Sequence, residues 1–328
     1  MVSFIIRRVL ILVPTIIIIS ILAFIVIELP PGDYVTNYMM VLQQTQGRDL
    51  SEAMLENLRK AYGLDRPVYV RYFIWFGKFV RGDLGYSLRW KKPVTELLAD
   101  RLPLTILVTL ASLAFSWIVA FPIGVYSAVR QYSIGDYIFT FFGFFGLSVP
   151  QFLFALVLMF LSAKYLDIGV GGLFSREFAS AGWSFGRVID LLKHLWIPMI
   201  VIGMAGTAGL IRILRANLLD ELKKPYVELA RAKGLKEARL VIKYPLRIAV
   251  NPFISSVGWI LPALISGTVI TAVVLDLPTA GPIFLQSLRT QDMALAGSFI
   301  MLMSILTVIG TLLSDILLAI VDPRIRYD

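Results

Sequence analysis

The sequence predicts an all-α integral membrane protein with six transmembrane helices, and three observations support this fold class. Of 328 residues, 58% are hydrophobic and 16% are charged, and the mean hydropathy is +0.79. A water-soluble domain of this size cannot bury so much apolar surface. Six uncharged runs each approach or exceed the roughly 20 helical residues needed to cross about 30 Å of hydrocarbon. These runs are unbroken, unlike the alternating segments of about ten residues in a β-barrel. The expected spans are Val9–Ile27, Leu102–Val129, Tyr137–Ala163, Leu195–Ile211, Ile248–Leu275 and Met293–Ser314.

The first apolar run follows Arg7 and Arg8, as the apolar region of a secretory signal would. It is longer than the about 7–15 residues of such a region. The residues that follow, from Glu28 to Asp33, lack the small-x-small pattern of a cleavage site. We therefore expect an uncleaved first transmembrane helix.

The distribution of Lys and Arg predicts the orientation. Ten of them lie in Arg212–Arg247, whereas the Asp276–Asp292 connection carries only Arg289. Basic residues in short loops favour the cytoplasm, so the Arg212–Arg247 side is expected inside. An even number of spans then places both termini in the cytoplasm. The external segment Glu28–Arg101 carries eleven Lys or Arg, but it exceeds the about 60 residues over which the rule operates.

The external segment between the first two spans is expected to contain two helices. The first is Ser51–Tyr62, with Ser51 as its N-cap and Gly63 just past its end. The second is Val68–Val80, which follows Pro67. An aromatic belt at the membrane interface explains the rings of this second helix more simply than direct contact with a transported solute. These rings belong to Tyr69, Tyr72, Phe73, Trp75, Phe76 and Phe79.

Motifs for catalysis are missing. No Gly-rich loop ends in Gly-Lys-Ser or Gly-Lys-Thr, and Gly77-Lys78-Phe79 lacks the hydroxyl that would hold Mg²⁺. With one His and no Cys, the chain is not expected to hold a transition-metal cluster. His194 is interpreted as an interfacial hydrogen-bonding residue. No Gly-x-Ser-x-Gly motif is present. The sequence therefore predicts no catalytic residues and no metal site, as for a transport subunit rather than an enzyme.

Charged residues inside the apolar runs would indicate an ion-driven carrier. Only Asp315 interrupts an apolar stretch, near Asp322, Arg324 and Arg326, and we interpret it as a partner for a nearby cation or helix end. A secondary carrier or channel is the alternative of a different class. Without an internal ion relay, the energy for transport is expected from another polypeptide.

The segment Pro225–Pro252 is basic and helix-forming and lies between two apolar runs. Pro225 suits the first turn of a helix that ends at Gly234, and a second helix is expected over Leu235–Tyr244. Ala230 and Ala232 are small, so a partner surface would be able to approach the backbone closely. The simpler interpretation is a basic loop needed for topology or for anionic lipid.

This segment resembles the cytoplasmic loop of binding-protein-dependent ABC importer permeases, whose signature is Glu-Ala-Ala, three residues, then Gly. In this chain the corresponding residues are Glu228, Leu229, Ala230 and Gly234, so Leu229 replaces the middle Ala. The string YVELARAKGL is similar to the dipeptide and oligopeptide class, which also includes nickel and oligosaccharide permeases. Further pieces of this class occur in the same order: Pro31-Gly32-Asp33, Gly63-Leu64-Asp65, Gly82-Asp83-Leu84-Gly85-Tyr86-Ser87, Ser148-Val149-Pro150, His194-Leu195 and Asp322-Pro323-Arg324.

The resemblance implies a type I ABC importer permease fold. It implies one permease domain over residues 1–328, an external segment over 28–101 and an ATPase-coupling loop over 212–252. The solutes would be peptides or similar small molecules, with oligosaccharides as the alternative. The implied partners are a second, homologous permease (as a heterodimer), two ATPase subunits that bind ATP and Mg, an extracellular or periplasmic solute-binding protein and the lipid bilayer.

No nucleic acid partner is implied, and this chain itself would bind no cofactor. The implied location is the cytoplasmic (inner) membrane of a bacterium or archaeon. The coupling residues would be Tyr226, Glu228, Leu229, Ala230, Ala232 and Gly234.

Besides Leu229 in the signature, three positions depart from the family pattern. Ala272 stands where relatives carry an acidic residue before a Pro-Gly pair, and here Thr279 directly follows Pro278. Tyr244 stands where relatives often have His. The first departure lies in the half expected outside, so the substrate class stays open.

Overall fold

The computed structural model describes residues 2–29, 35, 52–61, 63–87, 89–165, 171–255, 268–290 and 292–321. It divides into two compact units, and each is assembled from separate stretches of chain. Unit 1 comprises residues 1–8, 105–278 and 307–328, and unit 2 comprises residues 9–104 and 279–306. The stretches of the two units alternate along the sequence.

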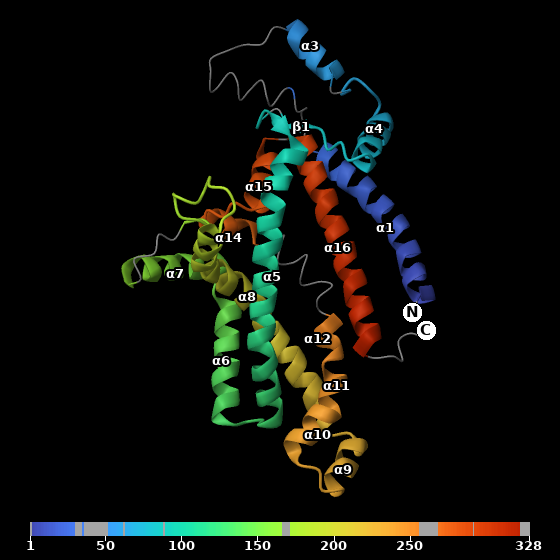
Figure 1. The fold of residues 1–328 in the computed structure, drawn as a ribbon. Helices are drawn as coiled ribbons and strands as arrows, with labels where there is room; N and C mark the ends of the chain where they lie inside the picture. The colour runs from blue at the N-terminus through green and yellow to red at the C-terminus, as the bar shows by residue number, and fades with distance from the viewer. Residues whose placement is uncertain are drawn as a thin grey trace. The chain divides into compact units, whose positions relative to one another are not determined.

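The described residues are mostly helical (Figure 1). A single two-stranded antiparallel pair is described, in which Tyr86 lies opposite Pro93. Among the described residues, three helices are long and apolar enough to cross a membrane: Val94–Val129, Phe185–Leu222 and Met293–Ile320. The elements are α1 (Val2–Glu28), α3 (Glu52–Ala61), α4 (Val68–Val80), β1 (Tyr86–Ser87), β2 (Lys92–Pro93), α5 (Val94–Val129), α6 (Ile134–Ser148), α7 (Gln151–Tyr165), α8 (Phe185–Leu222), α9 (Pro225–Ala232), α10 (Glu237–Lys243), α11 (Pro245–Ala249), α12 (Asn251–Ser255), α14 (Val269–Val274), α15 (Ala280–Arg289) and α16 (Met293–Val321).

Four of the expected spans lie within single helices, namely α1, α5, α8 and α16. The third apolar run does not form one helix. It divides into α6 and α7 at Pro150, because proline lacks an N–H and its ring forces the preceding Val149 into an extended conformation, with φ −85° and ψ 125°. The fifth run contains α12 and α14, and residues 256–267 between them lie outside the described part.

The two helices expected in the external segment are present. Helix α4 has the predicted bounds, Val68–Val80, and begins directly after Pro67. Helix α3 covers Glu52–Ala61, and Gly63 beyond it has φ +65°. The predicted N-cap, Ser51, lies outside the described residues.

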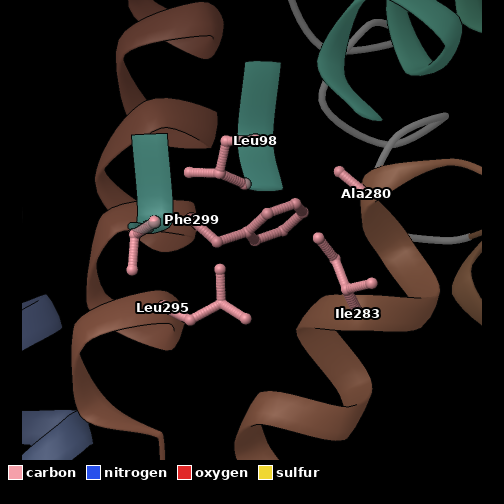
Figure 2. Packing of buried hydrophobic residues seen from close by; sticks show 6 residues of the cluster. Leu98, Ala280, Ile283, Leu295 and Phe299 are labelled. Carbon is pink, nitrogen blue, oxygen red and sulfur yellow. The ribbon is translucent and has the colours of Figure 1, made fainter. Parts of the chain in front are cut away.

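The apolar core of unit 2 joins the start of α5 to α15 and α16. Leu98 from α5, Ile283 from α15 and Leu295 from α16 are buried, and the rings of Phe284 and Phe299 stack with centroids 4.3 Å apart. Figure 2 shows Leu98, Ile283, Leu295 and Phe299, from three separate stretches of chain, meeting in one cluster.

A buried polar contact fixes the start of α16 in this unit. The hydroxyl of Ser87 donates to one carboxylate oxygen of Asp292, and the other oxygen accepts from the Leu295 N–H at 3.2 Å. Asp292 has no exposed surface. Its carboxylate therefore caps the helix N-terminus.

The aromatic face of α4 packs against α1. The ring of Phe24 lies 5.6 Å from those of Tyr72 and Trp75, and the hydroxyls of Ser20 and Tyr72 are 2.8 Å apart. Arg71 forms an ion pair with Glu28. Tyr69 and Phe73 remain 68% exposed, so they are the rings of this helix that are free to face lipid or a partner.

In unit 1, α5 and α8 approach very closely at Gly203. A Cβ atom at this position would lie 2.7 Å from a ring carbon of Phe115 and 2.8 Å from the carbonyl oxygen of Ser112. The Ser116 hydroxyl donates to the Gly203 carbonyl at 2.6 Å. Small residues and interhelical hydroxyls of this kind join helices in membranes.

Candidate functional site

Helix α8 continues beyond the apolar run Leu195–Ile211 into the basic segment that follows. Its 38 residues extend about 57 Å at 1.5 Å per residue. The apolar run stops at Arg212, but Leu214 and Leu218 stay fully buried on one face. The amphipathic pattern therefore keeps the helix intact to Leu222.

Helix α9 starts three residues after α8 ends, with Pro225 at its first turn. The hydroxyl of Tyr226 donates to the carboxylate of Glu221 on α8. Burial, together with this carboxylate, raises the pKa of Tyr226, so the phenol stays protonated. The contact ties the start of α9 to the end of α8.

The inner face of α9 packs within the chain. Val227 has no exposed surface, and Ala230 is 6% exposed. Helix α9 contacts α10, α10 contacts α11, and α11 contacts α8. Ala230 was expected to leave room for a partner, but its small side chain instead packs against this chain.

The outer face of α9 is open. Glu228 and Ala232 are exposed, and Leu229 is 59% exposed. An apolar side chain beside a small one offers a projection and a recess that a partner surface can match.

A rigid turn follows the helix at Gly234. Its φ is +75°, a conformation that residues with a side chain rarely adopt. The Gly234 N–H donates to the Arg231 carbonyl at 3.0 Å. Arg231 also forms an exposed ion pair with Glu237 at the start of α10. A backbone hydrogen bond and an ion pair, both from Arg231, thus hold the α9–α10 hairpin together around the glycine.

The structure brings all six predicted coupling residues onto α9 and its C-terminal turn. The sequence did not indicate the Tyr226–Glu221 contact, the Arg231–Glu237 pair or the burial of Val227. The six-residue spacing of Arg231 and Glu237 spans a turn, so helical periodicity gave no signal for it.

His194 has an 8% exposed side chain, and its Nδ1 lies 2.8 Å from the Asp190 carbonyl oxygen. It borders a cavity of about 10 Å³ that is lined partly by Pro198 and Leu275, a volume near that of one water probe.

Two of the positions that depart from the family pattern lie in described helices or at their ends. Ala272 is buried in α14, and Tyr244 is the C-cap residue of α10. Within the described residues, no group of three or more His, Asp or Glu is placed to hold a metal ion.

Three helices long and apolar enough to cross a membrane indicate an integral membrane protein, and the exposed α9–α10 hairpin gives it a surface outside those helices. The chain belongs to the family described as "Binding-protein-dependent transport system inner membrane component", whose model matches residues 120–327. The model of the N-terminal part of this family matches residues 1–109.

Curated relatives match along the full length. The oligopeptide transport system permease protein AppB of Bacillus subtilis is 38% identical over 328 residues and covers the whole of both chains. OppB of Haemophilus influenzae, an oligopeptide transport system permease protein, is 30% identical over 328 residues, again with full coverage of both. The dipeptide transport system permease protein DppB of Escherichia coli is 29% identical, covering 100% of this chain and 99% of DppB.

Among solved structures, a chain of the MetNI methionine ABC transporter in inward-facing conformations has a TM-score of 0.51 and 16% identity. The match covers 69% of this chain and 96% of that one. At this identity the likeness supports the fold, that of an ABC importer permease.

Proposed function

We propose that this chain is the transmembrane permease subunit of an ATP-driven importer of peptides or similar small solutes. The observation that carries the proposal is the α9–α10 hairpin, which exposes Leu229 and is fastened to the long helix α8 through Tyr226 and Glu221. A braced hairpin at the end of a membrane-length helix is suited to receive a push from a partner.

The proposed assembly contains this chain, a second homologous permease, two ATPase subunits that bind ATP and Mg, and an external solute-binding protein. The outer face of α9, with Glu228, Leu229 and Ala232, would sit in a groove of one ATPase. ATP binding would favour one arrangement of the ATPases, and α9 would carry that bias into α8. This movement would open the solute cavity of the permease to the outside. Hydrolysis and product release would return this cavity to its inward-open state.

The names of the full-length relatives favour peptides over oligosaccharides as the solute, because they include oligopeptide and dipeptide permeases. Ala272, which replaces an acidic residue of the family pattern, is 3% exposed.

The proposed location is the cytoplasmic membrane of a bacterium or archaeon, with α9 and both termini inside. The supporting observation is the charge distribution, with ten Lys or Arg in the segment around α9.

The test is purification of the tagged chain with the gene products encoded beside it, followed by reconstitution into liposomes. We expect two ATPase chains to co-purify and labelled tri-alanine to accumulate only with ATP and the cognate solute-binding protein. Uptake driven by an ion gradient without ATP would favour a secondary carrier instead. Labelled maltotriose is the control solute, and its accumulation in place of the peptide would support the oligosaccharide alternative.

A further inference from the structure

A buried ion pair links the α5–α6 turn to α8. Arg215 on α8 donates to both carboxylate oxygens of Asp136 on α6, from Nε at 3.1 Å and from Nη2 at 2.9 Å. The Asp136 side chain is 3% exposed and that of Arg215 is 29% exposed. This two-pronged geometry fixes orientation as well as distance, which a Lys at position 215 would not do. We call this pair the Asp136–Arg215 clamp.

The turn itself holds Asp136 in place. The Tyr132 N–H donates to Asp136 at 3.0 Å, and Tyr132 has φ +62°. Ser133 caps the start of α6 by accepting from the Asp136 N–H at 3.2 Å. A Cβ at Gly135 would lie 2.5 Å from the Tyr126 hydroxyl, so α5 and α6 pack tightly beside the turn. A force on Asp136 therefore acts on the whole α5–α6 turn.

The space beside the clamp is not filled by side chains. A cavity of about 150 Å³ lies between α6 and α8, lined by Phe139, Thr140, Gly143, Ala208, Ile211, Arg212 and Arg215. Beyond it the helices close up, since a Cβ at Gly146 would lie 3.2 Å from the Met204 methyl carbon. At this end of unit 1, the clamp joins α6 to α8 directly, beside the packing of α5 on α8, where a Cβ at Gly124 would lie 3.1 Å from Leu214.

The clamp lies close to the coupling hairpin along α8. Arg215 precedes Leu222, the last residue of α8, by two helical turns, and Tyr226 is tied back to Glu221 in the last turn. Figure 1 shows the α5–α6 turn and α9 at the same end of unit 1. A displacement of α9 thus reaches Arg215 through about two turns of continuous helix.

We propose that the Asp136–Arg215 clamp transmits the movement of the coupling hairpin from α8 to the α5–α6 turn, so that both parts move as one body during the transport cycle. Asp136 and Arg215 act as positioning residues that touch neither solute nor nucleotide. The inference rests on the proposed function, because it needs a push at α9. It adds the contact through which the movement of α8 reaches the α5–α6 turn.

The first test compares solute uptake with ATP consumption in the reconstituted complex. For Asp136→Asn and Arg215→Gln we expect ATP hydrolysis to continue while tri-alanine taken up per ATP falls about tenfold. Arg215→Lys keeps the charge but loses the two-pronged geometry, so we expect the ratio to fall there as well while the thermal unfolding midpoint of the complex is kept. A purely structural role predicts that the ratio falls only together with that midpoint. The matched controls are Asp100→Asn and Arg176→Gln, which change exposed residues away from the coupling loop and leave the ratio unchanged. Unchanged coupling in both single variants would overturn the proposal.

The second test measures a distance across the clamp. The chain has no Cys, so it can be labelled at Gln131→Cys and Ala216→Cys and then assembled with unlabelled partner subunits, and the two spin labels report one distance across the clamp. We expect the same narrow distance distribution without nucleotide and with ATP trapped by vanadate, and a broader one when Asp136→Asn is added. A shift of the distribution on ATP trapping would show that the two parts move separately and would overturn the clamp alone. Absence of any ATP-dependent uptake by the unaltered complex would overturn the proposed function and the clamp together.

Discussion

Arg231 and Glu237 form an ion pair across the turn at Gly234, joining the last turn of α9 to the first turn of α10. The pair is exposed, so it stabilises the hairpin only weakly in water. The backbone conformation of Gly234 supplies the stronger constraint, because the turn depends on a left-handed residue at that position.

Gly234→Val is expected to uncouple transport while the protein remains inserted in the membrane. A residue with a side chain at φ +75° costs roughly 1–2 kcal/mol, and no other atom lies within 4 Å of the added Cβ, so the cost is conformational rather than a clash. The measurement is uptake per ATP hydrolysed, with Gly77→Ala as a control at a helical glycine with equally open space. Normal coupling in Gly234→Val would show that the turn is not needed.

Leu229→Asp is expected to weaken binding of the ATPase subunits by about tenfold or more, as loss of an apolar anchor at an interface does. The folded chain itself should keep its thermal stability, because an exposed substitution changes it by about 0.5 kcal/mol at most. Ile242→Asp is the matched control, since Ile242 is 64% exposed on the neighbouring α10. Equal ATPase affinity for both variants, measured by titration in detergent, would remove Leu229 from the interface.

Gly203→Ala is expected to destabilise the packing of α5 on α8 by about 1–3 kcal/mol, because a backbone carbonyl stands 2.8 Å from the new Cβ and cannot move without shifting α5. Gly209→Ala on the same helix meets no other atom within 4 Å and should be neutral or slightly stabilising. The measurement is the midpoint of thermal unfolding in detergent. Similar midpoints for the two variants would argue against the close approach.

The α9–α10 hairpin is expected to keep its stability between pH 8 and about pH 5.5. The hydrogen bond from Arg231 lowers the pKa of Glu237 below its ordinary value of 4.5. A lowered folded-state pKa gives stability that is present above the ordinary value and is lost as the pH falls through the folded-state value. Amide hydrogen exchange over residues 225–243, corrected for intrinsic rates, tests this. Glu237→Gln should exchange faster throughout, and a fall in protection of the unaltered chain between pH 8 and pH 5.5 would contradict the assignment.

The sequence predicted the elements whose signals are local. Helix α4 has its predicted bounds because Pro67 starts it and the apolar aromatic run ends at Val80. The turn at Gly234 was likewise readable from the glycine. The break between α6 and α7 was missed because proline is tolerated inside membrane helices, and hydropathy alone does not distinguish a kink from an end.

Contacts between distant residues were not predictable from the pattern. Asp136 and Arg215 are 79 residues apart, and each reads as an ordinary charged residue at the end of an apolar run. The burial of Ala230 was missed for a similar reason, since a small residue suits both an internal contact and a partner surface. In the candidate site, the sequence identified the helix, and the structure separated its inner face from its outer face.

The length of α8 has a consequence for the lipid environment. A rod of about 57 Å exceeds the roughly 30 Å of hydrocarbon by nearly half its own length. With α9 docked on an ATPase as proposed, bilayer thickness sets how far this docking face stands from the lipid headgroups. A thicker bilayer would bring that face closer to the headgroups unless α8 tilts less. Acyl-chain length is therefore a physical variable that acts on the mechanics of this transporter.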